Sequence, residues 1–227
     1  GAELNVCSGD ITINASDDCL NAANSDLTDY DFTMTISGGA IDAYTSGGDG
    51  FDSNGELTIT GGTVVVWTAN TADNGPLDAD GTITVSGGTV LAVGGSSGMG
   101  MNLVASQPCV IFSGAAEMPG GNIQNGQPSG EERSSGNEQP NGGERPDGEG
   151  QPARGGSPGG ASLLTQGSAF AVVDSNGTSL YTGEAVYNAS FVFFSSGDLS
   201  EGESYTLSSG ETQTESVAQT GTVSAGM

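Results

Sequence analysis

The chain has 227 residues, of which 34% are hydrophobic and 40 are glycine, a composition that suits one domain with many tight turns. It has 28 Asp and Glu residues against three Arg, contains neither Lys nor His, and has a formal net charge of −25. This charge excludes nucleic acid and anionic membranes as partners and favours cations, above all calcium, because Asp and Asn offer hard oxygen ligands. No apolar run is long enough to insert into a membrane.

Four copies of one pattern organise residues 1–118, and they begin at Leu4, Met34, Leu57 and Ile83. In each copy, a strand that alternates apolar and polar residues is followed by a glycine corner and a second alternating strand. A repeat of roughly 20–29 residues with two strands cannot bury its own apolar side, so neighbouring copies must stack. The pattern therefore predicts an all-β fold, a parallel β-helix, rather than a leucine-rich repeat or an immunoglobulin-like sandwich.

Each predicted coil closes with a turn in which an apolar residue precedes an Asp or Asn. Coils stacked in register about 4.8 Å apart would align these polar residues in one outward column flanked by further carboxylates. The column would contain Asn21, Asp52, Asp78 and Asn102, and the flanking residues would be Asp17, Asp18, Asp49 and Asp80.

Carboxylates at such spacing repel one another unless a cation joins them. We therefore predict a calcium site whose ligands come from the column and its flanks. The alternative is a turn role without metal, since Asp and Asn are ordinary turn residues and Asn ladders stabilise coil corners. The predicted metal ligands are Asp17, Asp18, Asn21, Asp49, Asp52, Asp78 and Asp80.

The turn motifs Ala15–Ala22 (ASDDCLNA), Gly48–Gly55 (GDGFDSNG) and Asn74–Gly81 (NGPLDADG) resemble those of a bacterial family of carbohydrate-binding domains, long catalogued as a domain of unknown function. The segment 191–206 is similar to the closing strands of that family. The resemblance implies a right-handed parallel β-helix, bound calcium, and binding of acidic polysaccharide such as polygalacturonate or pectin. Its fold and calcium arrangement also resemble family 9 pectate lyases.

Those lyases, as the resemblance implies, abstract a proton with Lys or Arg beside calcium. This chain has no Lys and no His, and Arg133, Arg145 and Arg154 all lie in a low-complexity stretch. We therefore expect a secreted or cell-surface glycan-binding protein, its signal peptide removed, rather than an enzyme. The alternatives are an extracellular structural β-helix that forms oligomers or filaments stapled by calcium, and a uronate-active lyase or hydrolase.

Three aromatic residues, Tyr30, Tyr44 and Trp67, are candidates for stacking on sugar rings. Tyr44 and Trp67 end the second strand of their coils, so a packing role is the alternative for both. The three cysteines, Cys7, Cys19 and Cys109, allow at most one internal disulfide, and we expect them to act as small core residues.

The chain divides by composition. Residues 1–118 carry the coils, and residues 119–160 form a low-complexity insert, expected to be flexible, of Gly, Pro, Gln, Ser, Glu and Arg. Residues 161–209 are expected to supply the last strands of the helix and a C-terminal β-strand cap of the same domain. Residues 210–227 form a polar tail with no clear assignment.

Overall fold

The computed structural model describes residues 2–24, 26–27, 30–70, 74–95, 102–114 and 162–223. The predicted insert at 119–160 and the turn at 96–101 lie outside these ranges. The described residues contain 18 strands and no helix, which confirms the all-β prediction, and none of them forms a helix able to cross a bilayer. Residues 1–116 and 159–227 belong to one compact unit.

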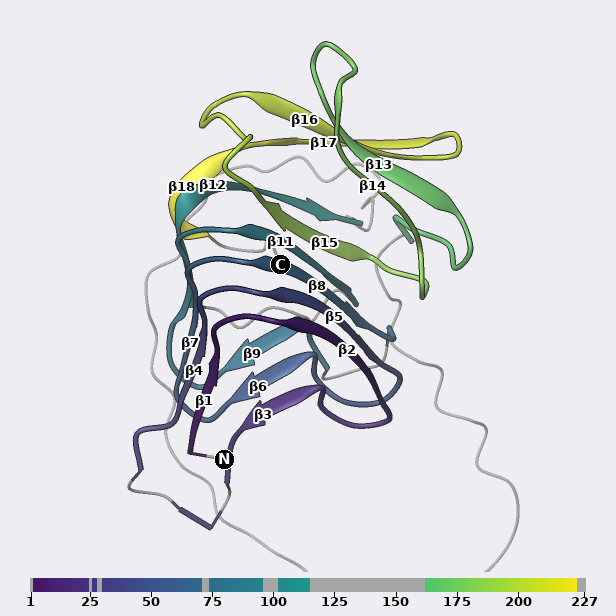
Figure 1. Ribbon diagram of the computed structural model, residues 1–227. Helices are drawn as coiled ribbons and strands as arrows, with labels where there is room; N and C mark the ends of the chain where they lie inside the picture. The colour runs from purple at the N-terminus through teal and green to yellow at the C-terminus, as the bar shows by residue number, and fades with distance from the viewer. Residues whose placement is uncertain are drawn as a thin grey trace, which may run out of the picture. The chain divides into compact units, whose positions relative to one another are not determined.

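Successive coils of a parallel β-solenoid make up the N-terminal part of this unit (Figure 1). Each complete coil gives one strand to each of three stacks, and every pairing within these stacks is parallel, as predicted. The first stack contains β1 (Glu3–Val6), β4 (Thr33–Ile36), β7 (Glu56–Ile59) and β10 (Ile83–Val85); the second contains β2 (Asp10–Ala15), β5 (Ala40–Thr45), β8 (Thr63–Thr68) and β11 (Thr89–Gly94); the third contains β3 (Leu20–Ala22), β6 (Phe51–Ser53) and β9 (Leu77–Ala79).

A glycine corner joins the first strand of each coil to the second. Gly39 and Gly62 have φ angles of +96° and +89°, in a region that L side chains rarely adopt. The corners also stack closely, because a Cβ atom on Gly62 would lie 2.7 Å from the carbonyl oxygen of Gly39. The repeated glycine thus marks a place where both the turn and the neighbouring coil exclude a side chain.

The interior of the solenoid is filled by rows of like residues. One such row consists of Val6, Ile36, Ile59 and Val85, which face one another across successive parallel pairs. Fully burying such a side chain stabilises the fold by about 1.5–3 kcal/mol. The inward residues of β2 are only half-buried, whereas those of β5 and β8 are fully buried, so the first coil is the open end of the solenoid.

The structure corrects the predicted position of Asn102, which lies beside the first stack and not in the third. The carbonyl of Asn102 accepts a hydrogen bond from the amide of Ile83, and β12 (Leu103–Ser113) continues directly beside β10 in the first stack. Asn102 therefore precedes a strand of the first stack and lies outside the column formed by Asn21, Asp52 and Asp78.

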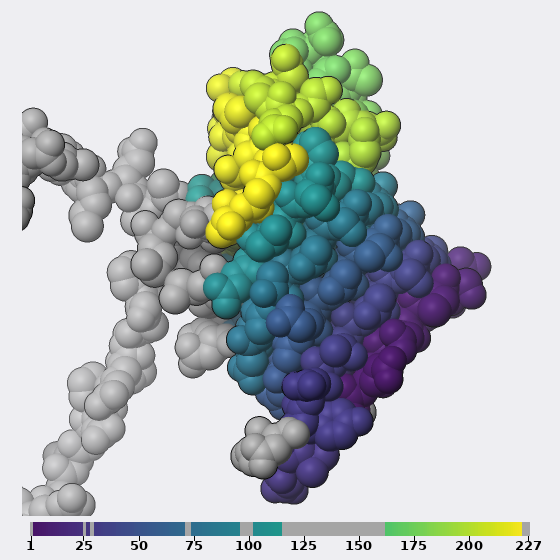
Figure 2. Space-filling model, turned by 90° about the vertical axis from the view of Figure 1, so that its left-hand side faces the viewer, coloured from purple at the N-terminus to yellow at the C-terminus, as the bar shows by residue number. Residues whose placement is uncertain are grey.

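Antiparallel strands close the end of the solenoid opposite the first coil (Figure 1). β15 (Phe191–Ser195) lies between β11 and the second half of β12 and is antiparallel to both. β18 (Gln219–Val223) runs along β12 (Figure 2), so part of the expected polar tail is a strand. These pairings satisfy strand edges that would otherwise be open, and they confirm the predicted C-terminal cap.

A four-stranded antiparallel sheet completes the cap and packs on the outer side of the second stack. Val65 and Trp67 of β8, although their side chains point away from the solenoid core, are buried in an apolar cluster with Phe170 of this sheet. The continuous apolar run in β8 therefore reflects burial on both sides of the strand. The sheet consists, in spatial order, of β14 (Ser179–Glu184), β13 (Ala169–Asp174), β16 (Ser204–Ser209) and β17 (Thr212–Val217).

The three cysteines are free thiols. Cys109 lies in the solenoid core, and burial raises its pKa to about 12. Cys19 is half-buried, and its pKa is raised to about 11, mainly by burial and then by the charge of Asp18. The expected core role is therefore right for Cys109 and wrong for Cys7, which is exposed.

Candidate functional site

A column of polar side chains runs along the outer side of the third stack. The parallel register pairs Asn21 with Asp52 and Asp52 with Asp78. The residue before each of them packs into the solenoid core, because side chains on a strand alternate between its two sides. The structure thus brings together three of the four residues predicted for this column, and we call these three the polar column.

Two flanking carboxylates bind the turns of neighbouring coils. Oδ1 of Asp18 accepts a hydrogen bond from the backbone N–H of Asp49 at 2.9 Å, and Oδ1 of Asp49 accepts one from the backbone N–H of Gly75 at 2.6 Å. Each bond links one coil to the next. These contacts are the turn role that the sequence left open, and they also fix both carboxylates beside the polar column.

Amide side chains separate some of the carboxylates. Nδ2 of Asn21 donates to Oδ2 of Asp18 at 2.7 Å and to Oδ2 of Asp52 at 3.0 Å. On the next coils, Nδ2 of Asn54 donates to Oδ2 of Asp80 at 3.2 Å. Since a primary amide has only two N–H donors and carries no charge, these bonds relieve part of the repulsion and leave the negative charge in place.

We define the acidic cluster as Asp18, Asp49, Asp52, Asp78 and Asp80. The negative charges of the other four residues act on Asp52. The pKa of Asp52 is raised to about 6, chiefly by burial and then by the charges of the other four. The pKa of Asp49 is also raised, again chiefly by burial. The described part of the chain contains no Lys, Arg or His that would offset this charge.

We expect Asp52→Asn to stabilise the protein at pH 7.5 when no divalent cation is added. The pKa of Asp52 is about 6 in the folded state and about 4 in the unfolded chain, so the folded state binds more protons between these values. Stability of the unchanged protein should therefore fall as pH rises from about 4 to 6, and the substitution should remove that fall. Urea unfolding measures this, and an equal effect of the substitution at pH 4.5 and 7.5 would contradict it.

The donor chemistry of the acidic cluster suits calcium, which takes 6–8 oxygen ligands at about 2.3–2.6 Å. Among the residues that the structure describes, however, no three acidic or cysteine side chains are gathered closely enough to hold a metal ion. Binding calcium would therefore require Asp52 and its neighbours to change rotamer, which surface carboxylates do at small cost.

The other predicted ligand, Asp17, lies at the rim of the cluster. Its side chain is exposed, and its backbone carbonyl accepts a hydrogen bond from the hydroxyl of Thr45 at 2.7 Å. Its charge contributes, as a minor cause, to the raised pKa of Asp49. Asp17 is thus close enough to act on the cluster electrostatically.

The three predicted aromatic residues lie in different surroundings. Tyr30 is 54% exposed, and its ring lies 5.4 Å from that of Phe32. Tyr44 is half-buried beside the cap. Trp67 is only 2% exposed and meets Phe170 edge-on at 5.8 Å. The predicted stacking of Trp67 on sugar is therefore wrong, because the cap covers this ring, and its packing role is the one that holds.

Sequence reasoning missed two residues beside Tyr44. The pKa of Tyr181 is raised by burial, then by Asp42 and by Tyr44, so both side chains lie near its phenol. The alternation of β5 directs Asp42 outward together with Tyr44, and this signal could have found Asp42. No sequence signal connects Tyr181, which comes from the cap, to the second coil.

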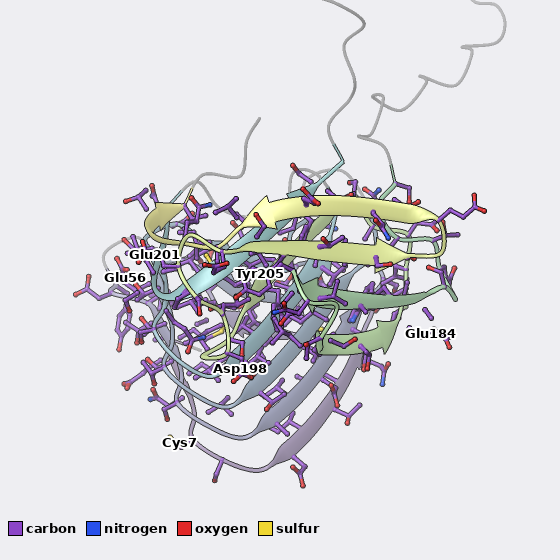
Figure 3. All side chains as sticks on the ribbon, turned by 90° about the horizontal axis from the view of Figure 1, so that it is seen from above. Cys7, Glu56, Glu184, Asp198, Glu201 and Tyr205 are labelled. Carbon is purple, nitrogen blue, oxygen red and sulfur yellow. The ribbon has the colours of Figure 1, made fainter. Side chains whose placement is uncertain are left out.

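A polar hollow of about 220 Å³ lies in the cap, and its lining includes Asp174, Asp198 and Tyr205. Figure 3 labels Asp198 and Tyr205. The hydroxyl of Tyr205 accepts a hydrogen bond from the amide of Ser200 at 2.9 Å. Oδ1 of Asp174 accepts bonds from two backbone N–H groups of its own turn, chiefly that of Thr178, which lowers its pKa. These contacts hold the loops of the cap.

Comparison with known families adds one match. A family model described as "Carbohydrate-binding domain-containing protein" matches residues 2–129, more than half of the chain and a range that includes every coil and the polar column. Searches of curated proteins and of solved structures each returned no match.

Proposed function

Because the chain belongs to the family of carbohydrate-binding domain-containing proteins, we propose that it binds acidic polysaccharide through calcium held on the acidic cluster. Family membership supports a polysaccharide partner. The observation that supports calcium is the crowding of carboxylates around Asp52, whose pKa is raised to about 6. A divalent cation at this place would remove the repulsion between them.

The charge of the protein makes a cation necessary for an acidic ligand. The net charge is −25, and acidic side chains lie on several sides of the unit, with Glu56 and Glu201 on one side of the view and Glu184 on the other (Figure 3). A polyuronate should be repelled from such a surface. A bound calcium ion supplies local positive charge and open coordination positions that uronate oxygens can fill.

Three residues are best placed to hold calcium in this proposal. Asp52 lies in the middle of the polar column, Asp78 follows it on the next coil, and Asp18 shares the amide of Asn21 with Asp52. One oxygen of Asp18 and one of Asp49 already accept backbone hydrogen bonds, from Asp49 and from Gly75, so each of these residues would bind calcium through its other oxygen.

The proposed activity is binding without catalysis. The sequence has no Lys and no His, and the residues that the structure describes include no Arg, so the described surroundings of the column offer no basic side chain as proton acceptor. We also propose an extracellular location, because open calcium sites of modest affinity, about 10⁻⁴–10⁻³ M, fill at the calcium levels outside cells.

Retention on immobilised polygalacturonate tests the proposal. In millimolar calcium the protein should be retained, and the chelator EGTA should release it, because the cation that joins two negative surfaces is removed. Beads that carry an uncharged glucan serve as the control for chelator effects on the protein itself. Equal retention on polygalacturonate with calcium and with EGTA would contradict calcium-mediated binding.

A second candidate function is self-assembly. The first coil is at the end of every stack, so β1, β2 and β3 each have one unpaired edge within the described residues, and open edges favour addition of further strands. The net charge of −25 opposes this association unless calcium screens it. Calcium-dependent filaments in electron micrographs, without retention on polygalacturonate, would favour assembly over glycan binding.

A further inference from the structure

The outer side of the second stack changes character between the second and third coils. The cap covers β8, where Val65 and Trp67 are only 8% and 2% exposed. It leaves the previous coil open, where Asp42 is exposed and Tyr44 half-buried. The edge of the cap therefore stands above an open part of the stack, and we call this place the step.

The parallel register determines which residues lie at the step. Tyr44 pairs with Trp67 on the covered side and with Asn14 on the open side, and Asp42 pairs with Val65 and with Thr12. Both Asn14 and Thr12 are exposed. The open coils thus present hydroxyl, amide and carboxylate groups next to a phenol ring.

Tyr181 forms the cap side of the step, and packed rings hold it in place. Its ring stacks on Phe170 at 5.8 Å with an interplanar angle of 25°, and it meets Phe194 at 5.9 Å. Tyr44 and Tyr181 both pack against the same apolar cluster beneath the cap, so the solenoid and cap sides of the step meet at these two rings. The charge of Asp42 also contributes to the raised pKa of Tyr181. Ring pairs of this kind fix the orientation of an aromatic side chain.

We infer that the step is a second glycan-binding site, which takes an uncharged sugar chain without metal. The C–H side of a pyranose ring can lie on Tyr44 against Tyr181, while its hydroxyl groups bond to Asp42 and Asn14. An uncharged ligand is favoured because the described residues offer no basic group near Asp42. The inference rests on the proposed carbohydrate binding, but neither on calcium nor on the acidic cluster.

Isothermal titration with cellohexaose in the presence of EGTA tests the inference. The unchanged protein should bind, and Tyr44→Ala should weaken binding roughly threefold to tenfold through loss of the ring contact. Asp42→Asn should also weaken binding, and because Asp42 is exposed this change spares the fold. Val217→Ala is the control, since Val217 is an exposed apolar residue on β17, at the opposite edge of the cap sheet from β14 and Tyr181, and this variant should bind cellohexaose as the unchanged protein does.

Each outcome bears on the inference. No binding of cellohexaose by the unchanged protein, or unaltered binding by both the Tyr44 and Asp42 variants, overturns it. The near-ultraviolet circular dichroism of Trp67, which is buried beneath the cap, shows whether a variant keeps the packing around the step. If the protein binds cellohexaose in EGTA but shows no calcium-dependent retention on polygalacturonate, the proposal of an acidic ligand is wrong and the inference of a glycan site at the step holds.

Discussion

Gly62→Ala should destabilise the protein by roughly 2–5 kcal/mol. A left-handed backbone angle costs an L residue about 1–2 kcal/mol, and Gly62 has a φ of +89°. The added Cβ would also lie 2.7 Å from the carbonyl oxygen of Gly39, and overpacking of this kind costs about 1–3 kcal/mol more. Urea unfolding of the variant measures the sum.

Gly9→Ala is the matched control for this substitution. Gly9 occupies the same corner in the first coil and has a φ of +104°, but a Cβ atom there would meet nothing within 4 Å. Its substitution should therefore lower the free energy of unfolding only by the cost of the left-handed backbone angle, about 1–2 kcal/mol. Equal losses for Gly9→Ala and Gly62→Ala would mean that close stacking of the corners contributes nothing to stability.

The double substitution Asp52→Asn, Asp78→Asn should abolish calcium-dependent retention on polygalacturonate. It removes two carboxylates from the polar column, and even residues that only support metal ligands cost about 10–100-fold in metal affinity when changed. The variant should fold, because both side chains point outward and Asn fits the same turns. Retention of the variant on the polygalacturonate beads, measured in millimolar calcium, gives the result.

Glu184→Gln with Glu215→Gln is the control for net charge. Both residues are exposed on the cap, on β14 and β17, away from the third stack, and the change alters the net charge by the same amount. This control should keep calcium-dependent retention. A similar loss in both double variants would indicate that overall charge, and not the polar column, governs binding.

The solenoid could be predicted from sequence because its determinants are local and repeated. Gly39 and Gly62 mark the same corner in successive coils, and the alternation on either side of them gives the strand pattern. Once these corners stack in register, Asn21, Asp52 and Asp78 must fall on one line. A repeat thus predicts long-range contacts that a sequence without repeats does not reveal.

The cap could not be predicted in the same way, because its contacts join segments that no repeat relates. Trp67 is the clearest case. The continuous apolar run of β8 is typical of a strand buried on both sides, but it does not identify the segment that covers it, and Phe170 lies far along the chain. For the same reason the neighbourhood of Tyr44 and Tyr181 follows only from the tertiary structure.

The candidate site was predicted in position but not in its internal bonding. Register brought the carboxylates together, but their side-chain partners depend on rotamers that sequence does not specify. The amide nitrogen of Asn21, which is a predicted ligand, donates to Asp18 and Asp52, and Asp49 is bound to the turn at Gly75. Any calcium ion would compete with these bonds.

A crystal structure of the protein grown with calcium, with an anomalous difference map, tests calcium binding by the acidic cluster most directly. We expect a calcium peak bounded by the side chains of Asp18, Asp52 and Asp78, with Asn21 turned away from at least one of its two present partners. A map with calcium peaks elsewhere and none at this cluster, with the amide of Asn21 still bonded to Asp18 and Asp52, would contradict the account.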